Sequence, residues 1–241
     1  MAKRKGKVVL GHLLMAGAGV GALAAWRWQL RWGATIAEQR CVLPGDQLIP
    51  QPVLQATRAI GIDAPPREVW PWLVQIGADK AGFYSCDRLE PEWQNLAVGD
   101  LVKLAESVCL GVAESDDGRA LVLSSALGAR PGGPVRDFSF SWAFVLEPEG
   151  PAGTRLVARE RYAWTKWRTG LAVKAANWIS FATTRRILAG VRDRAERSWR
   201  DQVTAHLEDG GCGPSDAPKS GADRDLGAAA AGSLPETGQS A

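Results

Sequence analysis

A strict alternation of bulky and small side chains runs from residue 138 to residue 146. The bulky side chains share one face of an extended chain and are Phe138, Phe140, Trp142, Phe144 and Leu146. The residues between them are Ser, Ala or Val. Alternation with a period of two over this length predicts a β-strand with one face turned toward a core. Residues 155–164 alternate in the same way after the turn at 148–153, so the two segments predict a hairpin.

Shorter apolar runs predict the rest of the sheet. Strands are expected at 57–62, 101–104, 108–113 and 120–124, with Gly- and Asp-containing turns between them. Pro65 and Pro66 open a helix that Gly77 closes. Residues 166 to about 207 carry an apolar stripe at helical spacing and predict a long C-terminal helix, broken near 181–184. The chain is therefore predicted to be an α+β protein with one curved antiparallel sheet.

The N-terminal region has the pattern of a membrane anchor. Residues 1–7 are basic, and the nineteen residues 8–26 contain no formal charge apart from the titratable His12. A helix of this length spans about 28 Å, close to the hydrocarbon thickness of a bilayer. We therefore expect a single-pass transmembrane helix over residues 8–28 in the cell membrane, with the folded domain extracytoplasmic. A cleaved signal peptide and a helix that does not span the membrane are the alternatives.

Composition places the remaining boundaries. Residues 29–56 are punctuated by Pro and Gly and predict an extended connector to a domain at 57–208. Residues 209–241 consist mostly of Gly, Ala, Ser, Pro and Asp, and they predict a disordered tail. The tail contains Leu-Pro-Glu-Thr-Gly at 234–238, which matches a sortase signal. The apolar segment and basic end that should follow such a signal are missing, so we interpret the match as chance.

Composition also argues against several classes of function. The formal net charge is +3, with 29 basic and 26 acidic residues interspersed, so no basic face for a nucleic acid is indicated. Two His and four Cys without Cys-x-x-Cys spacing argue against a zinc site and a Ser-His-Asp arrangement. No Gly-rich phosphate motif occurs. We therefore predict no metal and no cofactor, whereas the 11 Trp residues suit a cavity wall, a membrane interface or a core.

Four groups of short motifs resemble those of a known family. They are Arg-Trp-Gly-Ala-Thr at 31–35, Leu-Pro-Gly-Asp at 43–46, Ala-Pro-Pro at 64–66 with Val-Trp-Pro-Trp-Leu-Val-Gln-Ile-Gly at 69–77, and Gly-Phe-Tyr-Ser at 82–85. The chain resembles, over roughly residues 31–200, the actinobacterial membrane-anchored branch of the SRPBCC (START-like, polyketide cyclase-like) superfamily. The resemblance implies a helix-grip fold: a seven-stranded antiparallel sheet wrapped around a long C-terminal helix, with an apolar cavity between them. It implies a class of ligand but no reaction.

The side chains expected to contact such a ligand lie on the aromatic strand and on its neighbours. We predict ligand contacts from Phe138, Phe140, Trp142, Phe144, Tyr162 and Trp72, although close packing in a core explains the same face. Glu160 shares a face with Tyr162, and an inward carboxylate needs a partner or a raised pKa. A register slip would place Glu160 in solvent instead. Glu160, Asp87 and Tyr84 are weak candidates for catalysis.

The expected function is binding of an apolar small molecule, a lipid or a polyketide-like compound, by a membrane-tethered protein. The alternatives are a cyclase, dehydratase or hydrolase acting on such a ligand, and an interaction module with a filled core. A cavity lined almost wholly by apolar groups favours the carrier. An inward Glu160 with converging polar groups favours the enzyme, and a closed interior favours the interaction module.

Overall fold

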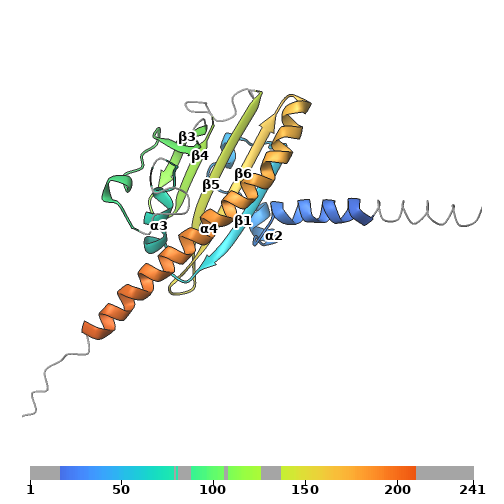
Figure 1. The fold of residues 1–241 in the computed structure, drawn as a ribbon. Coiled ribbons are helices and arrows are strands. Elements are labelled where there is room, and N and C mark those ends of the chain that lie inside the picture. The colour runs from blue at the N-terminus through green and yellow to red at the C-terminus, as the bar shows by residue number, and fades with distance from the viewer. Residues whose placement is uncertain (1–16, 79, 81–87, 106–107, 126–136, 210–241) are drawn as a thin grey trace, which may run out of the picture.

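The computed structural model describes residues 17–78, 80, 88–105, 108–125 and 137–209. These residues form one antiparallel sheet of six strands in the order β1-β6-β5-β4-β3-β2, whereas the resemblance implies seven. The strands are β1 (Leu54–Ile62), β2 (Leu101–Ala105), β3 (Val108–Asp116), β4 (Ala120–Ser124), β5 (Phe138–Glu149) and β6 (Gly153–Trp164). The helix α4 (Trp167–Asp209) runs obliquely across one face of the sheet, with α3 (Pro66–Val74) beside it (Figure 1). This is a helix-grip arrangement, as predicted.

The hairpin of β5 and β6 is the longest pairing in the sheet, and its register confirms the alternation in the sequence. Phe140 lies opposite Tyr162, Trp142 opposite Glu160, and Phe144 opposite Ala158. All six side chains share the face that packs against α3 and α4, which we call the inner face. The apolar core lies there and includes Val69, Leu73, Leu123, Trp142, Phe144, Leu156, Ile187, Leu188 and Val191.

Helix α4 is continuous over its 43 residues, so the predicted break near 181–184 is wrong. The polar and small residues around that point suggested an interruption. The structure shows that Phe181 and Thr184 both face the sheet and are buried. They continue the stripe of Val173 and Asn177 at helical spacing. The helix does not break at the polar members of this stripe, because their buried side chains find hydrogen-bond partners.

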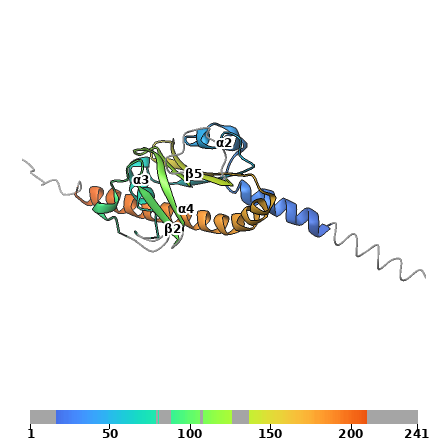
Figure 2. The same ribbon diagram turned by 90° about the horizontal axis from the view of Figure 1, so that it is seen from above.

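The opposite face of the sheet, which we call the outer face, is covered by residues 33–49. Because these residues fold back on the sheet, the prediction of an extended connector is wrong for them. They contain α2 (Ile36–Arg40) and the 3-10 turn η1 (Asp46–Leu48). Figure 2 shows α2 on the side of the sheet opposite to α4. A capping box starts α2: the Thr35 hydroxyl accepts a hydrogen bond from the Glu38 amide, and the Glu38 carboxylate accepts one from the Thr35 amide.

Three arginines of β6 hold this segment against the sheet. Arg155 pairs with Glu38 at 2.6 Å, Arg159 pairs with Asp46 at 2.6 Å, and Arg161 lies 3.1 Å from Asp46. Arg159 is 1% exposed and also donates to the backbone carbonyl of Glu38. The outer face of β6 is therefore an interior surface, although its sequence is rich in arginine.

Residues 17–30 form a further helix, whose last turn packs on the domain. The predicted transmembrane segment 8–28 begins in residues 1–16, which lie outside the described residues, as does the predicted tail from residue 210 onward. Among the helices formed by the described residues, none is both long enough and apolar enough to cross a membrane.

Candidate functional site

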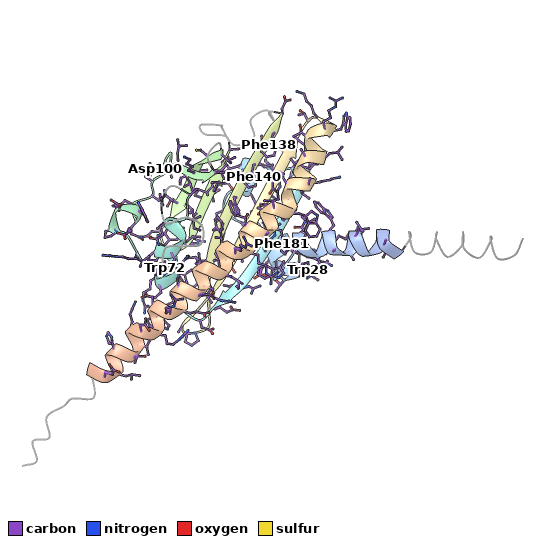
Figure 3. The ribbon with its side chains drawn as sticks, viewed as in Figure 1. Trp28, Trp72, Asp100, Phe138, Phe140 and Phe181 are labelled. Carbon is purple, nitrogen blue, oxygen red and sulfur yellow. The ribbon has the colours of Figure 1, made fainter. Side chains whose placement is uncertain are left out.

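The predicted ligand-contacting residues of β5 form a continuous aromatic wall on the inner face. Ring centroids lie 6.3 Å apart between Phe140 and Trp142 and 4.8 Å apart between Trp142 and Phe144. Tyr162 of β6 joins the wall at 4.8 Å from Phe140. Exposure falls along the strand from 41% at Phe138, through a half-buried Phe140, to 0% at Phe144. Figure 3 shows Phe138 beyond Phe140 toward the end of the sheet, so the wall is open at that end and closed at the other.

Two buried indole N–H groups on this side of the sheet have no hydrogen-bond partner among the described residues. They belong to Trp142 of β5 and to Trp72 of α3, which are 3% and 7% exposed. Both side chains are part of the inner core. Since a buried donor without a partner costs about 1–3 kcal/mol, such groups are uncommon and call for an explanation. These two donors are the buried polar groups of the inner core that lack a partner among the described residues.

Glu160 lies at the centre of a buried polar cluster between the sheet and α4. Its Oε1 accepts hydrogen bonds from Arg58 (2.6 Å), Thr184 (2.7 Å) and Ser180 (2.8 Å). Its Oε2 accepts one from the Tyr162 hydroxyl at 2.8 Å. The side chain therefore points inward, as the alternation requires, and no register slip carries it into solvent.

The same cluster fastens the N-terminal helix to the domain. Gln29, in the last turn of helix 17–30, donates to the Oδ1 of Asn177 at 2.7 Å and accepts a hydrogen bond from Arg58 at 3.1 Å. Arg58 also donates to the Gln29 carbonyl at 3.1 Å. Gln29, Arg58, Asn177 and Glu160 are each at most 1% exposed. A polar network that is this fully bonded fixes the relative positions of the elements that contribute to it.

The electrostatics of the cluster favour a positioning role for Glu160 over a catalytic one. Arg58 neutralises its charge, and both carboxylate oxygens already accept hydrogen bonds. Burial, and after it the neighbouring Glu160, raise the pKa of Tyr162 well above its ordinary value. The phenol therefore stays protonated and remains a donor to Glu160. An acid–base pair would instead need a carboxyl or phenol group with an open position facing a substrate.

The other two catalytic candidates, Tyr84 and Asp87, lie outside the described residues. Sequence reasoning did not identify Gln29, Arg58 or Asn177 as members of a site. The available signal was the alternation in β1, which places Arg58 on the same face as the buried Ala56 and the partly buried Ile60. Within the residues that the structure describes, no group of three His, Cys, Asp or Glu side chains gathers where it could hold a metal ion.

No protein-family model matches the chain, and no curated protein matches its sequence. Solved structures do match it. A polyketide cyclase-like protein from Corynebacterium glutamicum is 17% identical, with a TM-score of 0.32 over 67% of this chain and 97% of its own. CalU16 from Micromonospora echinospora is 16% identical, with a TM-score of 0.32 over 62% of this chain and 88% of its own. A protein from Mesorhizobium loti is 18% identical, with a TM-score of 0.36 over 58% of this chain and 97% of its own. These likenesses concern the fold alone.

Proposed function

We propose that this protein binds an apolar small molecule against the aromatic wall of its sheet and that residues 8–28 tether it to the cell membrane. The observation that carries the proposal is the pair of buried indole N–H groups on Trp72 and Trp142. An indole N–H can only donate, so what would satisfy it is an acceptor oxygen or nitrogen. The ligand should therefore be largely apolar and carry at least one carbonyl, ether or hydroxyl oxygen. Lipids and polyketide-like compounds both meet this description.

Binding without a reaction fits the chemistry of the inner face better than catalysis does. The carboxylate that the fold points inward, Glu160, is paired with Arg58 and is occupied by hydrogen bonds. The wall itself consists of aromatic rings, which supply contact area and stacking but no proton transfer. A cyclase, dehydratase or hydrolase activity would have to use groups other than Glu160.

The membrane tether is supported by the sequence of the N-terminal segment. Residues 8–26 lack formal charge, residues 1–7 carry four basic side chains, and the uncharged run ends at Trp26, with Trp28 two positions later. The heavier basic flank on the N-terminal side favours that end in the cytoplasm. The domain would then lie outside the cytoplasm, held close to the bilayer by the docking of Gln29.

Titration with two fluorescent probes tests the ligand proposal. Prodan is an apolar naphthalene with a carbonyl acceptor, and N-phenyl-1-naphthylamine is an apolar naphthalene without one. In a chain that begins at residue 17, Trp142→Phe and Trp72→Phe remove the N–H donors and keep aromatic rings. Loss of a net hydrogen bond worth about 0.5–1.5 kcal/mol should weaken prodan binding about 2–10-fold. Binding of N-phenyl-1-naphthylamine should change little.

Trp199→Phe is the matched control, since Trp199 stacks under Arg67 at the border of the same core and its N–H is not one of the two buried donors without a partner, so the change should leave both affinities unchanged. Equal loss of both probes in all three variants would contradict the role of the indole donors. A wild-type chain that binds neither probe would favour the interaction module with a filled core. Independently of the probes, native mass spectrometry of the protein purified from its host would identify a co-purified ligand by its mass.

A further inference from the structure

The first half of α4 differs in charge from the second half. Residues 167–192 contain basic side chains but no Asp or Glu, whereas acidic side chains return from Asp193 onward. The basic residues in the first half are Arg168, Lys174, Arg185, Arg186 and Arg192. The N-terminal region has the same bias, because the first acidic residue of the whole chain is Glu38. A surface formed by these two segments is therefore cationic.

The outward face of this half of α4 also carries large apolar side chains. Trp167, Leu171 and Ile179 are 70%, 59% and 72% exposed, and Trp178 is 42% exposed. The stripe that packs on the sheet lies on the opposite side of the helix, so these side chains contribute nothing to the inner core. A helix with large apolar residues and cations on one exposed face, and no acids, has the composition of helices that lie in a membrane interface.

Helix 17–30 joins this face directly. The rings of Trp26 and Trp178 lie 6.1 Å apart, and those of Trp28 and Phe181 lie 5.5 Å apart. Figure 3 shows Trp28 and Phe181 together at the crossing of the two helices. Figure 1 shows the helix leaving the domain from a point part-way along α4, on the side of the sheet where β1 lies. The exposed part of α4 is thus continuous with the apolar N-terminal segment.

On its other side, helix 17–30 borders a pocket of about 440 Å³ lined by arginines. Arg27 and Arg31 enter it from this helix and the turn that follows, and Arg40 enters from α2. The remaining lining residues are neutral: Leu30, Gln39, Gln55 and Thr57. None of the three arginines has an ion-pair partner among the described residues. Arginine side chains that line one pocket suit a phosphate or another anionic group.

We propose that the surface formed by the first half of α4, helix 17–30 and the arginine pocket docks on a bilayer that contains anionic headgroups. The apolar face of α4 enters the interfacial layer, and the arginine pocket binds a headgroup phosphate beside the point where helix 17–30 meets the membrane. The proposal rests on the membrane location proposed above and adds a fixed orientation of the domain. A second copy of the chain is a poor occupant, because a symmetric contact through this face would place cationic surfaces against each other.

Labelled full-length protein in vesicles tests the proposal. With the four native cysteines changed to Ser, Ile179→Cys and Leu207→Cys each place one NBD label on α4 at matched exposure, 72% and 73%. The protein is reconstituted into phosphatidylcholine vesicles with or without phosphatidylglycerol, and brominated lipids act as quenchers. The label at position 179 should be blue-shifted and quenched several-fold more strongly than the label at 207, most strongly with phosphatidylglycerol. Leu171→Glu should reduce this quenching, and Arg31→Gln combined with Arg40→Gln should weaken its dependence on phosphatidylglycerol.

Three results would overturn the docking surface. Equal quenching at positions 179 and 207 in vesicle-bound protein would refute it and leave the tether intact. A blue shift at 179 that appears without vesicles and grows with protein concentration would assign the face to a second copy. Full-length protein that fails to bind vesicles at all would remove both the tether and the docking surface.

Discussion

Replacing Glu160 by Gln should reveal how much the buried cluster stabilises the fold. The substitution keeps the shape of the side chain, removes its charge and puts an NH2 donor where one oxygen now accepts. Arg58 would then be a buried cation without a counter-charge, since the two side chains are 0% and 1% exposed. Breaking a buried ion pair by changing one partner costs about 3–5 kcal/mol. For a chain of this size, that corresponds to a fall in Tm of about 6–20 °C.

A second ion pair with nearly the same N–O distance provides the control. Lys166 and Asp137 approach to 2.5 Å, compared with 2.6 Å for Arg58 and Glu160, but both side chains are 66% exposed. Asp137→Asn should leave Tm within experimental error, because solvent screens an exposed pair. The two variants therefore separate the effect of burial from that of distance.

Thermal unfolding followed by circular dichroism measures both effects in the same chain. The double variant Arg58→Met with Glu160→Gln should be less destabilised than the sum of its single changes, because it leaves no unpaired charge. If Glu160→Gln lowers Tm no more than Asp137→Asn does, the ion pair is not a major source of stability. The assignment of Glu160 to a positioning role would then be wrong.

Three further changes test the outer face and the titration of single groups. Gly45→Ala should lower Tm, since Gly45 has φ +84° and an added Cβ would lie 2.5 Å from the Val122 side chain, whereas Gly118→Ala, also at positive φ but with open space around it, should cost less. The hydrogen bond from Arg155 lowers the pKa of Glu38, so stability from this pair is present above the ordinary carboxyl pKa and is lost on acidification. Glu38→Gln should make the decline of Tm at acidic pH less steep. The raised pKa of Tyr162 has the opposite effect on the pH dependence of stability. The protonated phenol stabilises the fold at neutral pH, this contribution is lost as the pH rises above about 10, and Tyr162→Phe should flatten that alkaline decline of Tm. An unchanged pH profile in either variant would contradict the corresponding assignment.

The alternation of side chains predicted the hairpin of β5 and β6 and the inward direction of Glu160, because a strand period of two is a local property. The partners of Glu160 were not predictable in this way. Arg58, which pairs with Glu160, lies 102 positions before it, and Gln29, which is hydrogen-bonded to Arg58, lies 131 positions before it, so only the folded sheet brings them together. Their polar character also suggested exposed positions, since arginine and glutamine are seldom fully buried without partners.

The connector shows the same limit on the other face of the sheet. Pro and Gly at residues 44, 45, 50 and 52 indicate irregular chain, but they do not distinguish an extended segment from one that folds back on the sheet. The residues that fold it back are Arg155 and Arg159, more than 110 positions later. Each of these arginines forms an ion pair with a carboxylate of the connector, Glu38 or Asp46. The local sequence of the connector could not predict its fold, because the fold depends on these long-range ion pairs.

The docking of Gln29 and Glu38 has a consequence for the order of events during synthesis. Gln29 finds Asn177 148 positions later, and Glu38 finds Arg155 117 positions later. Both segments emerge from the ribosome early, yet their binding surfaces exist only after β6 and the first turns of α4 have been made. Contacts of such large sequence separation form slowly, because the intervening loop must close first. The helix that leads into the domain is therefore made first and docked last, and until then the outer face of the sheet and the arginines of β6 remain open to the chaperones that meet the nascent chain.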